Sequence, residues 1–427
     1  MSLPGDLQAK MRLGEDKDIY YYGSKTLEKQ VIPTVQDTRF KQALPSLTGG
    51  SSTFIISPDE GVSDIIVAVK LPAQGAGIGV NGGVVDYSGC AVNRAWAYQL
   101  VKQCSVRYGS SSQYFFTGSQ MFVQNLREAS NPTSKNYLAK LGGACLKSNG
   151  GAGEFTGDAL FAYIVLNLPH SSSNASLEKP NPLPTEMMNQ PIVITLEMQP
   201  IQSIFRTRGA NANPPKQLED GYFQVRQIHA VDRGQLMRPT GFESAYSYPL
   251  KAFYQNEIAV PLTSTTAEQS VTLTGFRQGD VRSIFYWIED TADTNNPYNW
   301  VLPRDVKLLY NGAVYHDFAG VSSQIWDVLG CDIPANFENV VLDSSGSWTS
   351  TDTLTNWVNM PFSQVYEQLS GTHLMVKGKE INNAVVNVSL KLPTYSGAST
   401  AGRFVLHAVY AYNSILLMSG GGAEYVF

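Results

Sequence analysis

The chain has 427 residues, 43% of them hydrophobic and only 16% charged, and its formal net charge is −5. This length predicts two domains, because single cores rarely grow beyond about 250–300 residues. The negative net charge excludes a general polyanion-binding protein, and no apolar run reaches the ~18 residues that a membrane-spanning helix needs. Few charges with 22 Tyr and 18 Phe favour a surface covered by further copies of the chain. An ordinary secreted β-protein has the same composition.

The first fifty residues are polar and hold seven Lys/Arg against six Asp/Glu. Such a balance differs from the basic arm of a protein that packages nucleic acid. We therefore interpret residues 1–50 as an N-terminal arm.

Strand-like runs separated by turns dominate residues 51–206. Thr53–Ser57 and Asp64–Leu71 are β-branched runs joined by the turn Pro58–Gly61, which predicts neighbouring antiparallel strands. Helical patterns are short and lie in long connections. The expected helices cover residues 120–128, 134–141 and 323–329, and the further expected strands of this region cover residues 104–108, 161–166 and 192–198.

A polar stretch rich in Gly, Pro and Asn begins at Arg206 and has no periodicity, which is typical of a linker between domains. We place the linker at residues 207–220 and a second domain at residues 221–427. The strand pattern restarts there. Its expected strands cover residues 253–260, 271–276, 281–289, 306–315, 385–392 and 404–412.

The two halves of the chain repeat the same order of elements. Val101–Gly109 is followed by Phe116-Thr117-Gly118, and Val306–Gly312 is followed by Phe318-Ala319-Gly320. Each half then runs through a long irregular excursion and closes with an alternating strand that ends at a proline, Pro200 or Pro393. A duplicated unit of about eight short strands with long insertions predicts two tandem jelly-roll barrels. Fibronectin-like and lectin-like sandwiches also fit the pattern.

Each motif that could carry chemistry lacks a necessary part. Gly77–Gly82 satisfies G-x-G-x-x-G, but no helical period follows and no acidic residue lies between Asp86 and Glu128, so we expect a loop rather than a nucleotide site. The acidic run 289–296 lacks the central Gly and terminal Glu of a calcium loop. No G-x-S-x-G elbow occurs. We expect no catalytic residues and no cofactor.

Histidine and cysteine are also scattered. The five histidines include no H-x-H pair, so no metal site is expected, and His407 alternates with apolar residues like a satisfied core or interface histidine. Without short paired spacings, the cysteines are expected to be reduced thiols in a protein made inside a cell. These are Cys90, Cys104, Cys145 and Cys331.

Several segments, in chain order, resemble the double jelly-roll major capsid proteins of double-stranded DNA viruses. This group includes the nucleocytoplasmic large DNA viruses, virophages and adenovirus-like elements. The most specific segment is Ala408–Gly422, which resembles the closing strand of the family, with Leu417 where the family pattern carries Arg. Looser likenesses cover Asp64–Leu71, Val101–Thr117, Pro191–Phe205 and Val281–Gly312, and the aromatic/basic stretch that precedes the first barrel is only weakly matched by Arg39-Phe40-Lys41.

The resemblance implies an all-β protein of two eight-stranded jelly rolls with a few short helices in long loops. It implies a hexon-like homotrimer that tiles an icosahedral virion shell assembled inside the host cell. The implied partners are further copies, penton and minor capsid proteins and a membrane beneath the shell, with no specific nucleic acid. The arm 1–50 would lie at the inner face.

Contacts between subunits are assigned to the long excursions, residues 110–157 and 316–383. For each aromatic residue there, packing in the core is the alternative. The candidates are Tyr114, Phe115, Phe116, Trp326, Trp348 and Trp357.

Two other functions fit a chain of this composition. One is a carbohydrate- or receptor-binding β-sandwich that uses exposed Tyr and Trp as stacking platforms. The other is a two-domain cupin or a glycosidase, which would need clustered His or paired carboxylates that the sequence does not place together.

Overall fold

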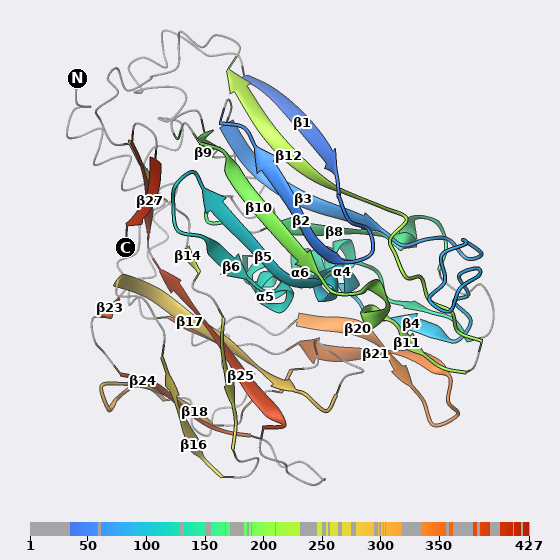
Figure 1. Ribbon diagram of the computed structural model, residues 1–427. Helices are drawn as coiled ribbons and strands as arrows, with labels where there is room; N and C mark the ends of the chain where they lie inside the picture. Colours follow the sequence, from blue (N-terminus) through green and yellow to red (C-terminus); the bar gives the residue numbers. More distant parts are fainter. Residues whose placement is uncertain are drawn as a thin grey trace.

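The computed structural model describes residues 35–170, 183–230, 246–317, 335–361, 379–392 and 402–426, apart from short breaks within these ranges. It consists mainly of antiparallel strands arranged in two units that lie side by side, one formed by strands β1 to β12 and the other by strands β14 to β25 (Figure 1). Among the described residues, none of the helices combines the length and the hydropathy required to cross a membrane.

The first unit is built from two sheets that face each other. The ring of Phe54 in one sheet stacks on that of Phe223 in the other with centroids 5.0 Å apart, so side chains of both inner faces share one core. One sheet has the order β1 (Val35–Ala43), β12 (Asp220–Ala230), β3 (Gly61–Lys70), β8 (Phe161–Leu166), with β9 (Leu183–Pro184) paired to β3. The other has the order β2 (Gly50–Ile56), β10 (Ile192–Met198), β5 (Val101–Tyr108), β6 (Tyr114–Phe116).

Strand β10 shows why these residues form a two-faced sheet. Its buried residues alternate with half-buried ones along all seven positions. Ile192, Ile194 and Leu196 point into the core, and Thr195 points outward between Thr53 and Ser105. This period of two matches the pleat of a strand with one face buried.

The second unit repeats this arrangement. One sheet has the order β14 (Phe253–Tyr254), β25 (Phe404–Tyr412), β17 (Gly279–Asp290), β22 (Val358–Pro361), with β15 (Ile258–Pro261) and β23 (Lys379–Ile381) paired to β25 and β17. The other has the order β16 (Gln269–Leu273), β24 (Val386–Lys391), β18 (Asp305–Tyr310), β19 (Ala313–Asp317). The turn between β18 and β19 has positive φ at both Asn311 and Gly312, as a tight hairpin requires.

The predicted internal repeat is confirmed strand by strand. The sheet β2-β10-β5-β6 has its counterpart in β16-β24-β18-β19, and the strand that ends before each proline, β10 or β24, is central in both. The opposite sheet places the unit's last strand, β12 or β25, beside a strand from early in the same unit, β3 or β17. The fold is therefore a double jelly roll, as predicted.

The predicted domain boundaries do not match the pairing of the strands. Strand β12, assigned to the second domain, pairs with β3 and with all nine residues of β1, so it closes the first unit. Strand β1, assigned to the N-terminal arm, belongs to the same sheet. The expected linker 207–220 consequently lies inside the first unit. Residues 1–34 of the arm lie outside the described residues.

A second difference concerns the first strand pair. Strands β2 and β3 were expected to be neighbours, but β2 pairs with β10 and β3 pairs with β8 and β12, in opposite sheets. The chain thus passes from one sheet to the other between Ile56 and Gly61. A short turn between two strands specifies their proximity, and tertiary packing decides whether they share a ladder.

Helices and smaller strands occupy the connections. Two predicted helices are present as α5 (Gly118–Glu128) and α6 (Pro132–Leu141), α4 (Trp96–Leu100) was not predicted, and the helix expected at 323–329 lies outside the described residues. The remaining elements are short turns of 3₁₀ helix at Gly157–Leu160 and Ile201–Ile204, a sheet of β11 (Arg206–Thr207), β4 (Cys90–Val92) and β7 (Leu146–Lys147), a hairpin of β20 (Ala335–Leu342) and β21 (Trp348–Thr355), and a sheet of β13 (Tyr246–Pro249), β26 (Ile415–Ser419) and β27 (Gly422–Val426).

The glycine-rich segment Gly77–Gly82 is a loop, as predicted. The side chain of Asn213 holds it from within the expected linker, donating from Nδ2 to the carbonyl oxygens of Gly82 and Val84 at 2.9 Å and accepting at Oδ1 from the backbone of Asn81 at 2.8 Å. These bonds explain why the polar stretch after Arg206 stays against the first unit.

Substituting Phe223 tests the assignment of β12 to the first unit. The side chain is fully buried, so Phe223→Ala should lower the free energy of unfolding by about 3–5 kcal/mol. The half-buried Gln227 on the same strand provides a control, and Gln227→Ala should change it by under about 0.5 kcal/mol. Denaturant unfolding, with hydrogen exchange of β2 and β3 to localise the loss, measures both. Unchanged exchange in β2 and β3 in Phe223→Ala would contradict the assignment.

Candidate functional site: the contact between the two units

Three of the six aromatic residues expected at subunit contacts pack inside the chain. Tyr114 and Phe116 are 1% exposed and Trp348 is 5% exposed, so these rings fill the core, which was the alternative for each. Phe115 points to the opposite face of β6 and keeps part of its surface. Trp326 and Trp357 lie outside the described residues.

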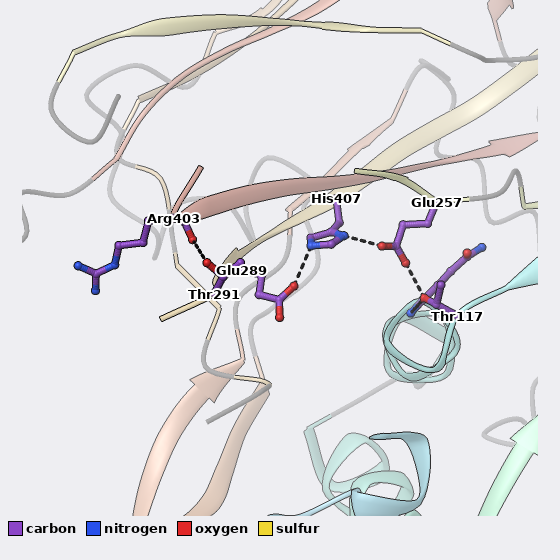
Figure 2. A network of polar contacts seen from close by, with 7 residues as sticks. Thr117, Glu257, Glu289, Thr291, Arg403 and His407 are labelled. Carbon is purple, nitrogen blue, oxygen red and sulfur yellow. Dashed lines mark hydrogen bonds and ion pairs between the residues drawn. The ribbon is translucent and has the colours of Figure 1, made fainter. Parts of the chain in front are cut away.

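Helix α5 of the first unit begins against the second unit (Figure 2). Thr117 caps the helix: its hydroxyl oxygen accepts the backbone N–H of Gln120 at 3.1 Å. The same hydroxyl donates to Glu257 Oε2 at 2.5 Å. Glu257 immediately precedes strand β15 of the second unit. The residue that caps the start of α5 in the first unit is therefore hydrogen-bonded to the second unit.

The chain of polar contacts continues into the second unit through His407 on β25. Its Nδ1 bonds Glu257 Oε1 at 2.5 Å and its Nε2 bonds Glu289 Oε2 at 3.0 Å, so both ring nitrogens have a carboxylate partner (Figure 2). The imidazole also stacks on Trp287, with centroids 5.3 Å apart and planes 4° apart. His407 is thus the satisfied interface histidine that the sequence predicted.

The charge state of His407 follows from these partners. Burial lowers the pKa of His407, but the hydrogen bonds and charges of Glu257 and Glu289 raise it more, so the pKa is about 9 instead of 6.5. The ring is therefore an imidazolium at neutral pH and donates from both nitrogens. With the side chains of His407 and Glu257 each only 12% exposed, this is a shielded ion pair.

The other end of α5 makes a second contact with the same face. Arg127 donates from a guanidinium nitrogen to Ser283 Oγ at 2.9 Å, and its guanidinium lies 5.4 Å from the centroid of the Phe285 ring. Both partners are on β17. Between the two ends, Phe122 packs on Tyr298 with centroids 4.4 Å apart. One helix thus lies along the outer face of the β17–β25 pair.

The hairpin β20–β21 of the second unit reaches across to the small sheet of the first (Figure 1). Trp348 donates from Nε1 to the carbonyl oxygen of Gly89 at 2.9 Å, and its backbone exchanges two hydrogen bonds with the side chain of Asn149. The guanidinium of Arg206 lies over the Trp348 ring and donates to the carbonyl oxygen of Val340. Because burial lowers the pKa of Arg206 only to about 10, it stays charged.

The C-terminal hairpin β26–β27 makes a third contact. The backbone N–H of Ala423 donates to Ser110 Oγ at 3.0 Å, and the ring of Tyr425 meets that of Tyr108 edge to face at 6.1 Å. Tyr108 in turn bonds His170 Nδ1 at 2.7 Å. A single hydrophobic cluster includes residues of both units, so the two jelly rolls form one body.

These contacts couple the two units mechanically. Within the described ranges, no three His, Cys, Asp or Glu side chains are grouped in a way that could hold a metal ion. Cys90 and Cys104 are free thiols and, like Cys145, they are buried. Burial raises the pKa of the Cys90 thiol to about 12, far from that of a reactive thiolate.

Sequence reasoning found His407 but not its partners. Glu257 lies 150 residues from it and Thr117 lies a further 140 away, so no local spacing links them. The one available signal was Thr117, a residue type that caps helices, three positions before the predicted helix 120–128. It suggests a cap but not what the cap contacts.

Raising the pH should weaken the His407 contact. Since the pKa is raised on folding, its stabilisation is complete below about pH 6.5 and is lost as the pH rises through about 9. His407→Gln should therefore destabilise the protein at pH 6.5, on the order of 2–3 kcal/mol, and the difference from wild type should shrink by pH 10. Unfolding curves across this range measure it. A difference that stays constant with pH would contradict a charged His407.

Removing the Trp348 ring should loosen the hairpin contact. Trp348→Ala deletes a buried ring and should lower the free energy of unfolding by about 3–5 kcal/mol, with faster hydrogen exchange around Gly89. Asp352→Ala, at an exposed position of the same strand, is the control and should change little. Equal effects of the two substitutions would show that the hairpin does not depend on this contact.

Comparisons with known proteins identify relatives by structure alone. Neither the family models nor the curated protein sequences contain a match to this chain. Among solved structures, PBCV-1 VP54, as fitted into a reconstruction of the virophage Sputnik, is similar with a TM-score of 0.59 at 10% identity, covering 93% of this chain and 98% of that one. A Sputnik virophage chain matches with a TM-score of 0.56 at 12% identity, covering 93% and 89%.

The Faustovirus major capsid protein matches with a TM-score of 0.50 at 9% identity, covering 93% of this chain and 94% of that one. In all three, nearly the whole length of both chains is aligned, so the likeness covers both units and their order. At such low identity it is a likeness of fold. The chain has the double jelly-roll fold of these viral proteins.

Proposed function

We propose that this chain is a major capsid protein that associates as a homotrimer, with trimers tiling an icosahedral virion shell. The observation that carries the proposal is the pair of equivalent jelly rolls, locked into one body by buried contacts and aligned over 93% of the chain with the Faustovirus major capsid protein. A shell protein needs this stiffness, because it functions through the shape of its outline and through its interfaces with other copies.

Chemistry and geometry support the proposal in different ways. Three copies of two similar barrels present a nearly hexagonal outline, which packs edge to edge. Closed sheets leave few free strand edges at high local density. The net charge of −5 argues against specific binding of nucleic acid, and we propose a structural role without catalysis or cofactors.

The partners follow from this role. They are further copies of the chain, penton and minor capsid proteins and a membrane beneath the shell, with assembly in the host cell. Of the six aromatic candidates, Phe115 keeps exposed surface and remains a candidate for contact between subunits, with Trp326 and Trp357.

The oligomeric state tests the proposal. Size-exclusion chromatography with light scattering should give a mass about three times the 46.7 kDa of the chain, and negative-stain electron microscopy should show particles with a hexagonal outline. A monomer at all concentrations, or a monomer that binds a sugar, would contradict the capsid role.

A further inference from the structure

Asparagine is followed by glycine at three places in the chain, Asn81-Gly82, Asn149-Gly150 and Asn311-Gly312. Such a pair is prone to spontaneous deamidation, because glycine has no Cβ to hinder the approach of its backbone nitrogen to the neighbouring carboxamide. In a folded protein, the rate depends on how freely the asparagine side chain can turn toward that nitrogen. The contacts that hold each asparagine therefore decide which pair reacts.

Asn149 is held at both atoms of its carboxamide. Its Nδ2 donates to the carbonyl oxygen of Trp348 at 3.0 Å, and its Oδ1 accepts from the backbone N–H of Trp348 at 2.7 Å. The ring of Trp348 is itself buried in the contact between the two units. Turning the carboxamide of Asn149 would therefore break two hydrogen bonds at this contact.

Asn311 is held by the hairpin in which it lies. Its backbone N–H donates to the carbonyl oxygen of Val385 and its Oδ1 accepts from the backbone N–H of Val385, both at 2.8 Å. Its φ of +50° is fixed by the pairing of β18 with β19 on either side of the turn. Moving this side chain would release the bond to Val385 and disturb the hairpin.

Asn81 lies in the glycine-rich loop between β3 and β4, drawn in blue at the end of the first unit remote from β27 (Figure 1). Its carboxamide is exposed and makes no hydrogen bond with any residue that the structure describes. The neighbouring Gly82 has open space around its Cα, and its backbone N–H donates only to the carbonyl oxygen of Gly79 at 3.1 Å. A single turn bond thus restrains this pair.

We propose that Asn81-Gly82 is a site of spontaneous deamidation, and that the product releases the loop from Asn213. The backbone nitrogen of Gly82 attacks Cγ of Asn81, the new C–N bond closes a succinimide ring, and the Cγ–Nδ2 bond breaks. The amide group takes up the proton of the Gly82 nitrogen and leaves as ammonia. Water then opens the ring at either carbonyl and gives aspartate or isoaspartate. One water is consumed and one ammonia is released, and the inference does not depend on the proposed function.

The product alters the part of the loop that Asn213 holds. Asn213 accepts the backbone N–H of Asn81 and donates to the carbonyl oxygen of Gly82, so one bond lies on each side of the reacting pair. Isoaspartate routes the backbone through the side-chain carbon and lengthens it by one atom, so both groups cannot keep their positions. The new carboxylate also repels Oδ1 of Asn213. We therefore expect the loop to detach from residues 212–216.

Peptide mapping of the folded, full-length protein after incubation in mildly alkaline buffer tests the site. Asn81 should deamidate roughly tenfold faster than Asn149 or Asn311, the ratio expected when the slower pairs must break additional hydrogen bonds. In guanidinium chloride the three pairs should react at similar rates, because unfolding removes these bonds. Mass spectrometry with electron-transfer fragmentation measures the rates and identifies isoaspartate. Equal rates in the folded protein, or a faster reaction at Asn149 or Asn311, would overturn the inference.

Hydrogen exchange tests the release of the loop. Asn81→Ser cannot deamidate and removes a side chain without hydrogen bonds, so it is the control and is incubated alongside the wild type. Exchange in residues 77–84 and 212–216 should become faster in the incubated wild type and stay unchanged in Asn81→Ser. Faster exchange in both proteins would show that the loop loosens without the modification. Unchanged exchange in wild type that mapping shows to be modified at Asn81 would equally overturn the release from Asn213.

Discussion

Covering the outer face of the β17–β25 pair is the constraint on which the arrangement of this protein depends. That face carries Phe285 and Trp287, large rings that would otherwise meet water, and it carries His407 in the same row. Helix α5 of the first unit, which lies in the long connection between β6 and β8, covers Ser283 and Phe285, and Trp300 of the second unit packs on Trp287. The segment inserted between β6 and β8 therefore forms part of the contact between the two units.

The charged side chain of His407 lies at the polar end of this contact, near the start of α5. Burying an imidazolium is unfavourable unless its N–H groups are paired, and Glu257 and Glu289 provide one partner for each nitrogen. Glu257 is in turn satisfied by the hydroxyl that caps α5. A single row of hydrogen bonds thus joins the helix start, the second unit and the sheet.

Two further contacts prevent the units from pivoting about α5. Trp348 anchors the β20–β21 hairpin on the small sheet of the first unit, and Tyr425 anchors the C-terminal hairpin on Tyr108. In each of the three contacts, one side comes from an inserted segment or from the C-terminal hairpin: helix α5, the hairpin β20–β21 or the hairpin β26–β27. Barrel strands are committed to their own ladders, so the segments that tolerate variation supply the coupling.

Local and repeated patterns in the sequence determined the fold class, the duplication, two helices and many of the strands, because alternation of side chains and turn residues act over a few positions. The same patterns placed β2 beside β3, and the first boundary before β12, since proximity along the chain does not reveal which ladder a strand joins. They also did not decide whether Tyr114, Phe116 and Trp348 pack in the core or lie at contacts between subunits. Only the tertiary structure decided these points and brought Thr117, Glu257 and His407 together, because such contacts join residues more than a hundred positions apart.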